Sequence, residues 1–262
     1  MILDDIVARR REQLERDMAK VPMTEVRAAA EEAAKTDTGR SFKNALTSLP
    51  CPAIIAEVKK ASPSKGIISG DFRPAEQAAA YQKAGAAAVS CLTEEYYFKG
   101  SAEYFAAVRK VVDIPMIRKD FIIDPYQIFE AKTMGADAVL LIAAILSTDQ
   151  MREYRTIAES LKMDVLAESH NEAEISSVID AGCTIFGVNN RNLKDFSVTL
   201  DTTKKLAELV PQGGIIVAES GIKTAEDMKF LADCGADAVL IGETLMRSGS
   251  VENSVKELRS LL

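Results

Sequence analysis

The chain has 262 residues, 47% of them hydrophobic and 27% charged, and its formal net charge is −7. This composition is typical of a globular protein, and the negative charge argues against nucleic acid or an anionic membrane as its main partner. The single histidine, His170, and the four cysteines, which form no CxxC pair, argue against the common zinc sites and against a disulfide framework. Because the sequence shows no membrane span or signal peptide, we predict a cytoplasmic protein.

Residues 1–50 precede the first predicted strand and have a helical pattern. Apolar residues recur at helical spacing over 3–18, and Pro22 ends that helix. An alanine-rich helix is predicted from 24 to about 34. We expect this N-terminal helical extension to pack on the domain that follows it rather than to form a second domain.

A short motif recurs through the rest of the chain. MGADAVLLI at 134–142 and CGADAVLIG at 234–242 are near copies, and AGAAAVSCL at 84–92 and AGCTIFGVN at 181–189 fit the same template. In each copy a helix is predicted to end at a left-handed glycine, after which a buried apolar strand begins.

Eight apolar runs are spaced as βα units require. They are continuous rather than alternating, as in strands that are covered on both faces. The predicted strands are 53–58, 86–92, 115–118, 137–142, 164–168, 184–188, 215–219 and 236–241. We therefore predict one α/β domain over 1–262, a (β/α)₈ TIM barrel with the helical extension 1–50. An open doubly wound sheet is less favoured, because no GxGxxG follows the first strand.

Helix start signals lie between these strands. Asp124 offers an N-cap acceptor before Pro125, which we place at the first helical position. Three pairs have the spacing of a capping box, namely Ser147 with Gln150, Asn171 with Glu174 and, more weakly, Thr224 with Asp227.

Charged side chains stand where several predicted strands end, which is where barrels of this kind carry their active sites. The cluster consists of Glu57, Lys59, Lys119, Glu168 and Glu219. Such a cluster can lower the pKa of a lysine and raise that of a carboxylate, as acid–base chemistry near neutral pH requires. A structural ion-pair network that caps the barrel is the alternative.

The last two strands are followed by glycines that predict a phosphate site. Ser220 and Gly221 follow the seventh strand, and Gly242 and Glu243 follow the eighth. Backbone N–H groups in these loops and at a helix start are the usual phosphate ligands of the fold. Ser62 and Arg191 could contribute from neighbouring loops, although simple turn glycines would give the same pattern.

Other polar and aromatic residues give weaker signals. His170 lies just beyond the fifth strand, and an exposed or structural histidine is favoured over a catalytic one. Tyr96, Tyr97 and Phe98 are candidates for the wall of the barrel mouth and Phe121 for stacking on an aromatic ligand, but apolar packing explains each equally well. The cysteines are interpreted as small core residues.

Five segments carry a resemblance to a known family. They are IAEVKKASPSKG at 55–66, RKDFI at 118–122, GVNNRNL at 187–193, VAESGI at 217–222 and LIGETLM at 240–246. In this order they closely resemble indole-3-glycerol phosphate synthases of tryptophan biosynthesis, and ILDDIVARRREQL at 2–14 is similar to that family's N-terminal extension. LAESH at 166–170 departs slightly, since the family often has valine on both sides of the glutamate.

The resemblance implies a reaction. The substrate would be 1-(2-carboxyphenylamino)-1-deoxyribulose 5-phosphate, and the products indole-3-glycerol phosphate, carbon dioxide and water. No metal or organic cofactor is implied. The family resemblance also implies a monomer, and leaves open a weak association with other enzymes of the tryptophan pathway.

The resemblance also implies residue roles. Lys119 would be the general acid, Lys59 a second lysine near the substrate carboxylate, and Glu168 the other acid–base group. Glu57, Asn189 and Glu219 would be positioning and electrostatic partners. The phosphate side would comprise Ser62, Arg191, Ser220, Gly221, Gly242 and Glu243, and the apolar wall Pro63, Phe98 and Phe121.

Three alternatives were weighed against this interpretation. A phosphoribosylanthranilate isomerase would need a cysteine at the first strand, where this chain has Glu57 and Lys59. A Schiff-base aldolase would usually have its lysine at the sixth strand, where Asn189 stands. A non-catalytic barrel that binds a phosphate ligand would be favoured by loss of Lys119 or Glu168, and both are present.

Overall fold

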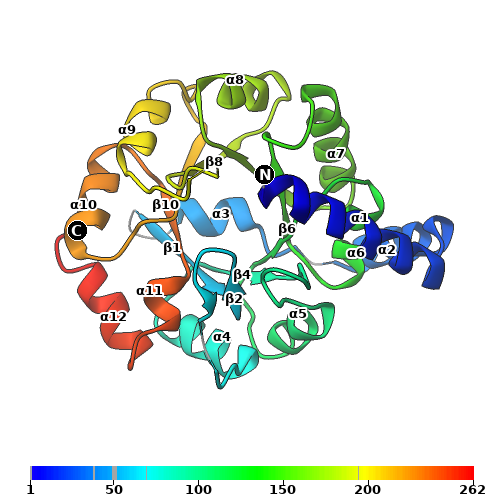
Figure 1. Cartoon of the computed structure of the whole chain (residues 1–262), viewed down its shortest axis with the longest axis horizontal. Coiled ribbons are helices and arrows are strands. Elements are labelled where there is room, and N and C mark those ends of the chain that lie inside the picture. The colour runs from blue at the N-terminus through cyan, green and yellow to red at the C-terminus, as the bar shows by residue number, and fades with distance from the viewer. Residues whose placement is uncertain (1, 38, 49–51, 69, 194) are drawn as a thin grey trace.

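Eight parallel strands close into a barrel in the computed structural model, which describes residues 2–37, 39–48, 52–68, 70–193 and 195–262 (Figure 1). Around the barrel the strand order is β1-β10-β9-β8-β7-β6-β5-β4. The bounds are β1 Ala53–Val58, β4 Ala88–Leu92, β5 Met116–Lys119, β6 Ala138–Ile142, β7 Asp164–Ser169, β8 Ile185–Asn189, β9 Ile215–Glu219 and β10 Ala238–Ile241. This closure confirms the predicted (β/α)₈ barrel, and each observed strand falls within two residues of a predicted run.

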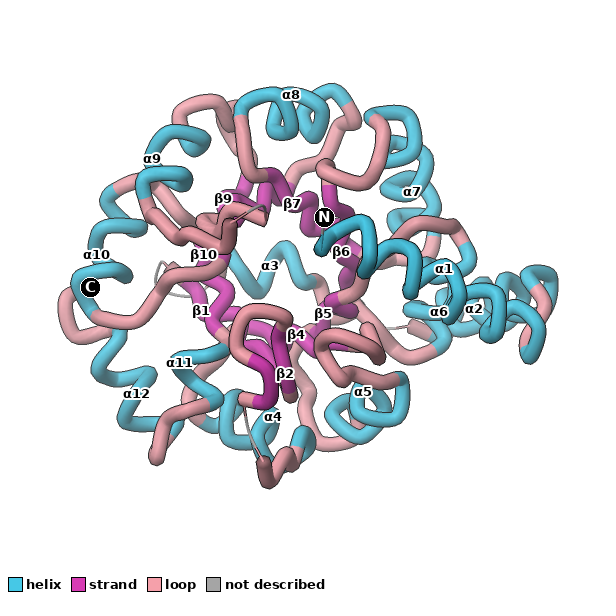
Figure 2. Tube along the Cα trace, in the orientation of Figure 1, coloured by secondary structure: helices cyan, strands magenta, loops and turns pink. Residues whose placement is uncertain are grey.

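Helices surround the barrel as an outer ring (Figure 2). They are α4 Pro74–Lys83, α5 Ala102–Arg109, α6 Tyr126–Thr133, α7 Thr148–Ser160, α8 Glu172–Asp180, α9 Asp201–Ala207, α10 Ala225–Asp233 and α12 Val251–Leu258, with the short α11 Glu243–Met246 after β10. In the described part of the chain, none of the helices combines the length and apolar character needed to cross a bilayer.

The predicted start and stop signals are largely confirmed. Capping boxes form at Ser147 and at Thr224, and the repeated glycines Gly85, Gly135, Gly182 and Gly235 all have a φ between +78° and +86°. Two details differ from the prediction. Helix α6 begins one residue later than predicted, with Asp124 accepting the Tyr126 N–H, and the Glu174 carboxylate accepts the N–H of His170 rather than that of Asn171.

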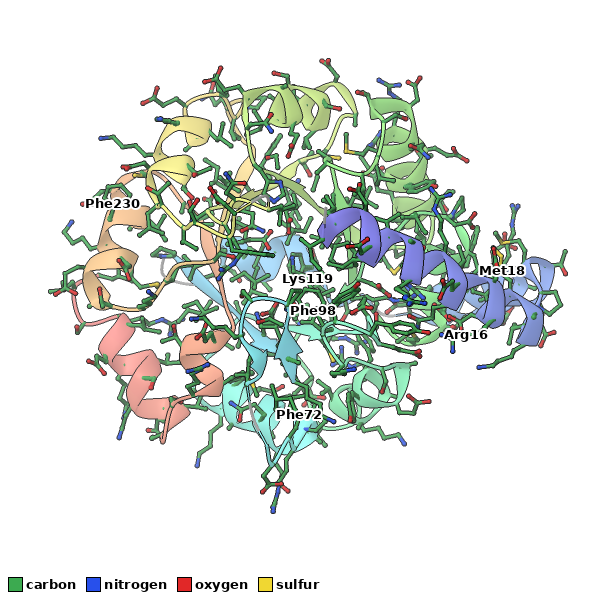
Figure 3. All side chains as sticks on the ribbon, viewed as in Figure 1. Arg16, Met18, Phe72, Phe98, Lys119 and Phe230 are labelled. Atoms are coloured by element: carbon green, nitrogen blue, oxygen red, sulfur yellow. The ribbon has the colours of Figure 1, made fainter. Side chains whose placement is uncertain are left out.

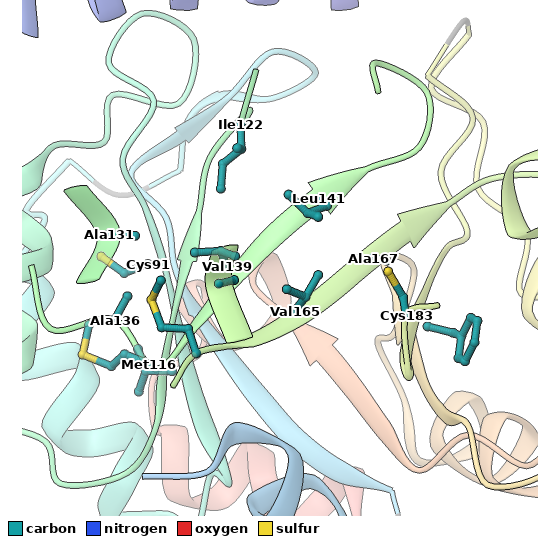
Figure 4. Close-up of a cluster of buried hydrophobic side chains, with 14 of the residues drawn as sticks. Cys91, Met116, Ile122, Ala131, Ala136, Val139, Leu141, Val165, Ala167 and Cys183 are labelled. Carbon is teal, nitrogen blue, oxygen red and sulfur yellow. The ribbon is translucent and has the colours of Figure 1, made fainter. Parts of the chain in front are cut away.

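The apolar core has two layers. One layer lies between the strands and the outer helices, where Val139, Val165 and the buried cysteines Cys91 and Cys183 pack together (Figure 4). The other fills the inside of the barrel, with Ile55, Leu140 and Val217 among its members. The cysteine interpretation holds for Cys91 and Cys183, Cys234 is only partly buried, and Cys51 lies outside the described residues.

The segment before β1 reaches both ends of the barrel. Helix α1 (Ile2–Lys20) begins at the rim of the mouth, at the C-terminal ends of the strands, and runs outward, and α2 (Met23–Thr36) packs against α6 (Figure 1). The prediction missed α3 (Phe42–Thr47), which closes the opposite end with its fully buried Phe42 and Leu46. It also missed the small hairpin of β2 (Ala61–Ser62) and β3 (Gly66–Ile67) in the loop after β1.

Candidate active site

A cavity of about 620 Å³ opens at the C-terminal ends of the strands. Every residue that we predicted for catalysis, for the phosphate or for the apolar wall lines this one cavity. Tyr96 and Tyr97 lie outside its described lining, so the wider aromatic wall is not formed by them. The apolar residues Ile2, Leu3 and Ile6 of α1 also line it. Leu3 and Ile6 were predicted only as part of an amphipathic helix, and none of the three was predicted as a cavity residue.

Lys119 lies near the middle of the barrel mouth (Figure 3). It is the last residue of β5, and its Nζ donates to Glu168 Oε2 from β7 and to Glu219 Oε2 from β9, each at 2.9 Å. Parallel pairing brings these strand ends to one edge of the sheet, so residues about 50 and 100 positions apart meet there. Lys119 is thus a nearly buried cation held between two carboxylates.

The charge state of Lys119 differs from the expectation. Burial alone would lower its pKa, but the charges of Glu168, Glu219 and Glu57 outweigh burial and hold the pKa of Lys119 above its usual range. The predicted lowering of a lysine pKa is therefore wrong for Lys119. The sign follows from two carboxylates at hydrogen-bond distance, which favour the charged ammonium. Lys119 is therefore held as the charged ammonium, the form that carries a proton.

The two carboxylates that hold Lys119 are not equivalent. Burial and the nearby charge of Glu168 raise the pKa of Glu219 to about 7, despite the opposing effect of Lys119. Burial would also raise the pKa of Glu168, but Lys119 and His170 outweigh it and hold the pKa of Glu168 below its usual range. The expectation of a raised carboxylate pKa is thus met by Glu219, while Glu168 stays ionised.

The remaining members of the polar cluster surround this centre. Glu57 is the penultimate residue of β1 and lines the cavity, and its Oε2 accepts a hydrogen bond from Lys59 Nζ. A Cβ on Gly242 would overlap the Glu57 carboxylate, so glycine at that position leaves room for it. Asn189, the last residue of β8, donates from Nδ2 to Glu168 Oε1 at 3.2 Å. The predicted cluster of two lysines and three glutamates therefore meets in one cavity as two bonded groups, Lys59 with Glu57 and Lys119 with the other two glutamates.

The loops after β9 and β10 form the predicted phosphate side. Ser220 and Gly221 both have left-handed backbones, with φ values of +66° and +88°. Such a backbone is strained for serine, and strain of this kind gathers at ligand sites. A Cβ on Gly221 would lie 2.6 Å from Val198 Cγ1, which excludes any larger residue without a shift. Helix α11 begins at Glu243. The N–H groups of its first turn have no partner within the helix, and they are directed toward the loop that lines the cavity.

The predicted apolar wall lines the same cavity as the charged cluster. The rings of Phe98 and Phe121 stand with centroids 5.9 Å apart at an interplanar angle of 39°. The loop that carries Phe98 is held by the buried Glu94, whose carboxylate accepts three backbone N–H groups, including that of Phe98. The role of Glu94 was not predicted, because nothing in a sequence shows which N–H groups a carboxylate will accept.

His170 lies behind the site rather than in it. Its ring stands between Glu168 and Glu174, and it is not part of the cavity wall within the described ranges. The preferred structural interpretation of this histidine fits its burial, but its contact with Glu168 was not predicted. No group of three or more His, Cys, Asp or Glu side chains among the described residues is placed to share a metal ion.

Comparison with known proteins decides the family. The family model for indole-3-glycerol phosphate synthase matches residues 3–258. The indole-3-glycerol phosphate synthase of Alkaliphilus metalliredigens is 45% identical over 260 residues, which cover 99% of this chain and 98% of that protein. The synthase of Desulfotalea psychrophila is 48% identical over 262 residues and covers 98% of each chain.

This chain belongs to the indole-3-glycerol phosphate synthase family. The members are carboxy-lyases of tryptophan biosynthesis that bind a phosphorylated substrate, and this assignment replaces the isomerase, aldolase and binding-protein alternatives. Among solved structures, thiamine phosphate pyrophosphorylase from Pyrococcus furiosus is similar, with a TM-score of 0.62 and 17% identity over 84% of this chain and 97% of that one. That likeness shows the barrel fold alone.

Proposed function

We propose that this cavity converts 1-(2-carboxyphenylamino)-1-deoxyribulose 5-phosphate to indole-3-glycerol phosphate, with Lys119 as the general acid of ring closure. The observation that carries the proposal is the position of Lys119, charged and nearly buried, between Glu168 and Glu219 at the cavity centre. The proposal includes a monomeric enzyme that needs no metal or organic cofactor, as the sequence resemblance implies, and that acts in the cytoplasm, as the sequence features predict.

The substrate pose follows from the two sides of the cavity. The phosphate would lie against Ser220, Gly221 and the start of α11, within reach of Arg191 and Ser62. The aromatic ring would lie against Pro63, Phe98 and Phe121. Two anchors at opposite ends fold the flexible ribulose chain back, so that the ring carbon bearing the carboxylate approaches the ketone. Such positioning removes much of the entropic barrier to ring closure.

In the first step, that ring carbon attacks the ketone carbon and negative charge develops on the ketone oxygen. The Lys119 ammonium stabilises this charge and delivers a proton to the oxygen, which becomes a hydroxyl group. The carbon–carbon bond to the carboxylate then breaks, carbon dioxide leaves and its electron pair restores the aromatic ring. Lys59, beside Glu57, would stay near the departing carboxylate.

In the last step, the new hydroxyl group leaves as water and a proton is lost from the neighbouring ring carbon, which completes the indole. This step needs an acid and a base. We assign the base to Glu168, which is ionised and would take up the ring proton, and the acid to the Lys59 ammonium, whose proton would leave with the hydroxyl group as water. The two roles could also be exchanged between Lys59 and Glu168.

Single-turnover measurements of carbon dioxide and indole test this division of roles. Lys119→Met is expected to release neither product, because ring closure fails. Glu168→Gln is expected to release about one equivalent of carbon dioxide while indole forms at least about 10²-fold more slowly, since only dehydration is blocked. Carbon dioxide release by Lys119→Met, or its loss in Glu168→Gln, would contradict the assignment. If Lys59→Met, rather than Glu168→Gln, released carbon dioxide but formed indole slowly, the roles of Lys59 and Glu168 in dehydration would be exchanged.

A further inference from the structure

The His170 imidazole links the polar network to the helix behind it. Its Nε2 lies 3.3 Å from Glu168 Oε1, and its Nδ1 lies 2.9 Å from Glu174 Oε2. The same Glu174 oxygen accepts the backbone N–H of His170 at 2.8 Å, which fixes the ring relative to α8. The side chain is 11% exposed. The Nδ1 contact therefore fixes the ring to α8, while Nε2 faces Glu168 as an ion-pair partner without a hydrogen bond to any described residue.

The surroundings of His170 keep it charged. Glu168 faces it from β7 and Glu174 from α8, while Asn189 of β8 and Asn171 before α8 contribute neutral amides to the same two carboxylates. Burial would lower the pKa of His170, but the two carboxylates outweigh burial and raise it to about 10. The ring is therefore an imidazolium at neutral pH, with both nitrogens as donors.

The two oxygens of Glu168 have separate partners. Oε2 accepts from Lys119 Nζ, and Oε1 accepts from Asn189 and faces His170. When Lys119 turns toward the ketone oxygen, Glu168 loses its nearest cation while it stays buried. An isolated buried carboxylate is costly and would take up a proton or move. A second cation facing Oε1 offsets this cost and keeps the carboxylate ionised and in place until Oε2 takes part in proton transfer.

We propose that His170 is a positioning residue, which holds Glu168 Oε1 so that Oε2 stays directed at the reacting atoms during dehydration. This inference rests on the acid–base role of Glu168 in the proposed function. A purely structural role would make His170 part of the start of α8. That start is already built by the Asn171 side chain, which accepts the Glu174 N–H, and by the backbone N–H of His170, so it does not need the imidazole.

The test separates carbon dioxide release from indole formation in a single turnover of the full-length enzyme. His170→Leu is expected to slow indole formation about tenfold while carbon dioxide release changes less than about twofold, because only the Glu168 step is affected. His170→Gln keeps a donor that reaches Glu168, and it is expected to recover indole formation to within about threefold of the parent. If leucine prevents folding, His170→Asn gives the same test, because its amide is too short to reach Glu168.

Asn171→Ala is the matched control. It weakens the start of α8 but leaves the His170–Glu168 contact, so its melting temperature should fall without a lag between carbon dioxide and indole. The proposal is overturned if His170→Leu shows no lag, if His170→Gln is no better than His170→Leu, or if Asn171→Ala shows the same lag. A lag in Glu168→Gln but not in His170→Leu removes this inference alone, whereas no lag in Glu168→Gln removes the assigned role of Glu168.

Discussion

At the N-terminal end of the barrel, the buried carboxylate of Asp137 has partners for both of its oxygens. Asp137 accepts hydrogen bonds from Arg40, from Arg109 and from the backbone of Met116 at 2.8–3.0 Å. At the C-terminal end, Glu219 accepts one hydrogen bond from Lys119 through Oε2, and its buried Oε1 has no partner among the described residues. Both ends bury acidic side chains, but only one end leaves a carboxylate oxygen unsatisfied.

This difference distinguishes structural from chemical use of buried charge. A fully paired carboxylate holds its neighbours in place, whereas a half-paired one lowers stability and keeps a group available for a ligand or a proton. The two ends also differ in how they are filled. Helix α3 closes the N-terminal end with Phe42 and Leu46, whereas the C-terminal end contains the open cavity. We therefore expect the same chemical substitution to affect stability at one location and turnover at the other.

The largest contrast is expected between two buried lysines. Lys119→Met should lower kcat by at least about 10³-fold while substrate still binds, because the proton donor of ring closure is lost. Lys132 pairs with Asp37 outside the cavity wall, and Lys132→Met should lower the free energy of unfolding by about 1–3 kcal/mol with kcat unchanged. Steady-state kinetics and urea unfolding measure the two effects. Near-normal turnover of Lys119→Met would contradict the assignment of the general acid.

A second contrast uses one acid-to-amide change at each end. Glu219→Gln should lower kcat about 10²-fold without lowering stability at pH 8, because it removes a carboxylate that burial disfavours. Asp137→Asn should lower the free energy of unfolding by about 2–3 kcal/mol with little change in kcat, since it leaves two arginines short of a counter-charge. If both variants lost stability and neither lost kcat, the distinction between a structural carboxylate at one end and a chemical carboxylate at the other would be wrong.

The raised pKa of Glu219 predicts a pH dependence of stability. The native state binds a proton at Glu219 up to about pH 7, whereas the unfolded chain releases it near 4.5. The contribution of this group to the free energy of unfolding therefore falls as pH rises from about 4.5 to 7. Relative to the parent, Glu219→Gln should therefore gain on the order of 2 kcal/mol in free energy of unfolding as the pH rises through that range, with no further gain at higher pH. Urea unfolding at several pH values measures this difference, and a constant difference would refute it.

The smallest contrast concerns two left-handed glycines. Gly221→Ala should raise KM about tenfold, because its backbone conformation and the nearby Val198 oppose a Cβ on the phosphate side. Gly235→Ala meets the same φ near +85° with open space around it, away from the cavity wall. Both variants should lose about 1 kcal/mol of stability, but only the first should change KM. An unchanged KM for Gly221→Ala would argue against a phosphate at this loop.

The barrel could be predicted because its signals are local. Each repeated glycine ends a helix and precedes a continuous apolar strand, and parallel pairing then fixes which strand ends meet. Helix α3 lacked such a signal, since its six residues include only Phe42 and Leu46 as large apolar side chains. The hairpin at Ala61–Ser62 and Gly66–Ile67 is equally short, and its pairing depends on the loop that contains it.

The site could be predicted as a set of residues but not as a network. The order of the strand ends brings Lys119, Glu168 and Glu219 together, and the sequence reveals that order. The direction of the Lys119 pKa shift depends on two distances of 2.9 Å, which no spacing in the sequence fixes. The contact of His170 with Glu168 likewise depends on how the chain turns after β7.

The most direct test mixes the purified protein with 1-(2-carboxyphenylamino)-1-deoxyribulose 5-phosphate and follows indole fluorescence. The chain has no tryptophan, so the protein background is limited to weak tyrosine emission. We predict a rise in fluorescence that persists in the presence of a chelator and is absent with Lys119→Met. A flat trace from folded parent protein would contradict the proposed reaction at this cavity.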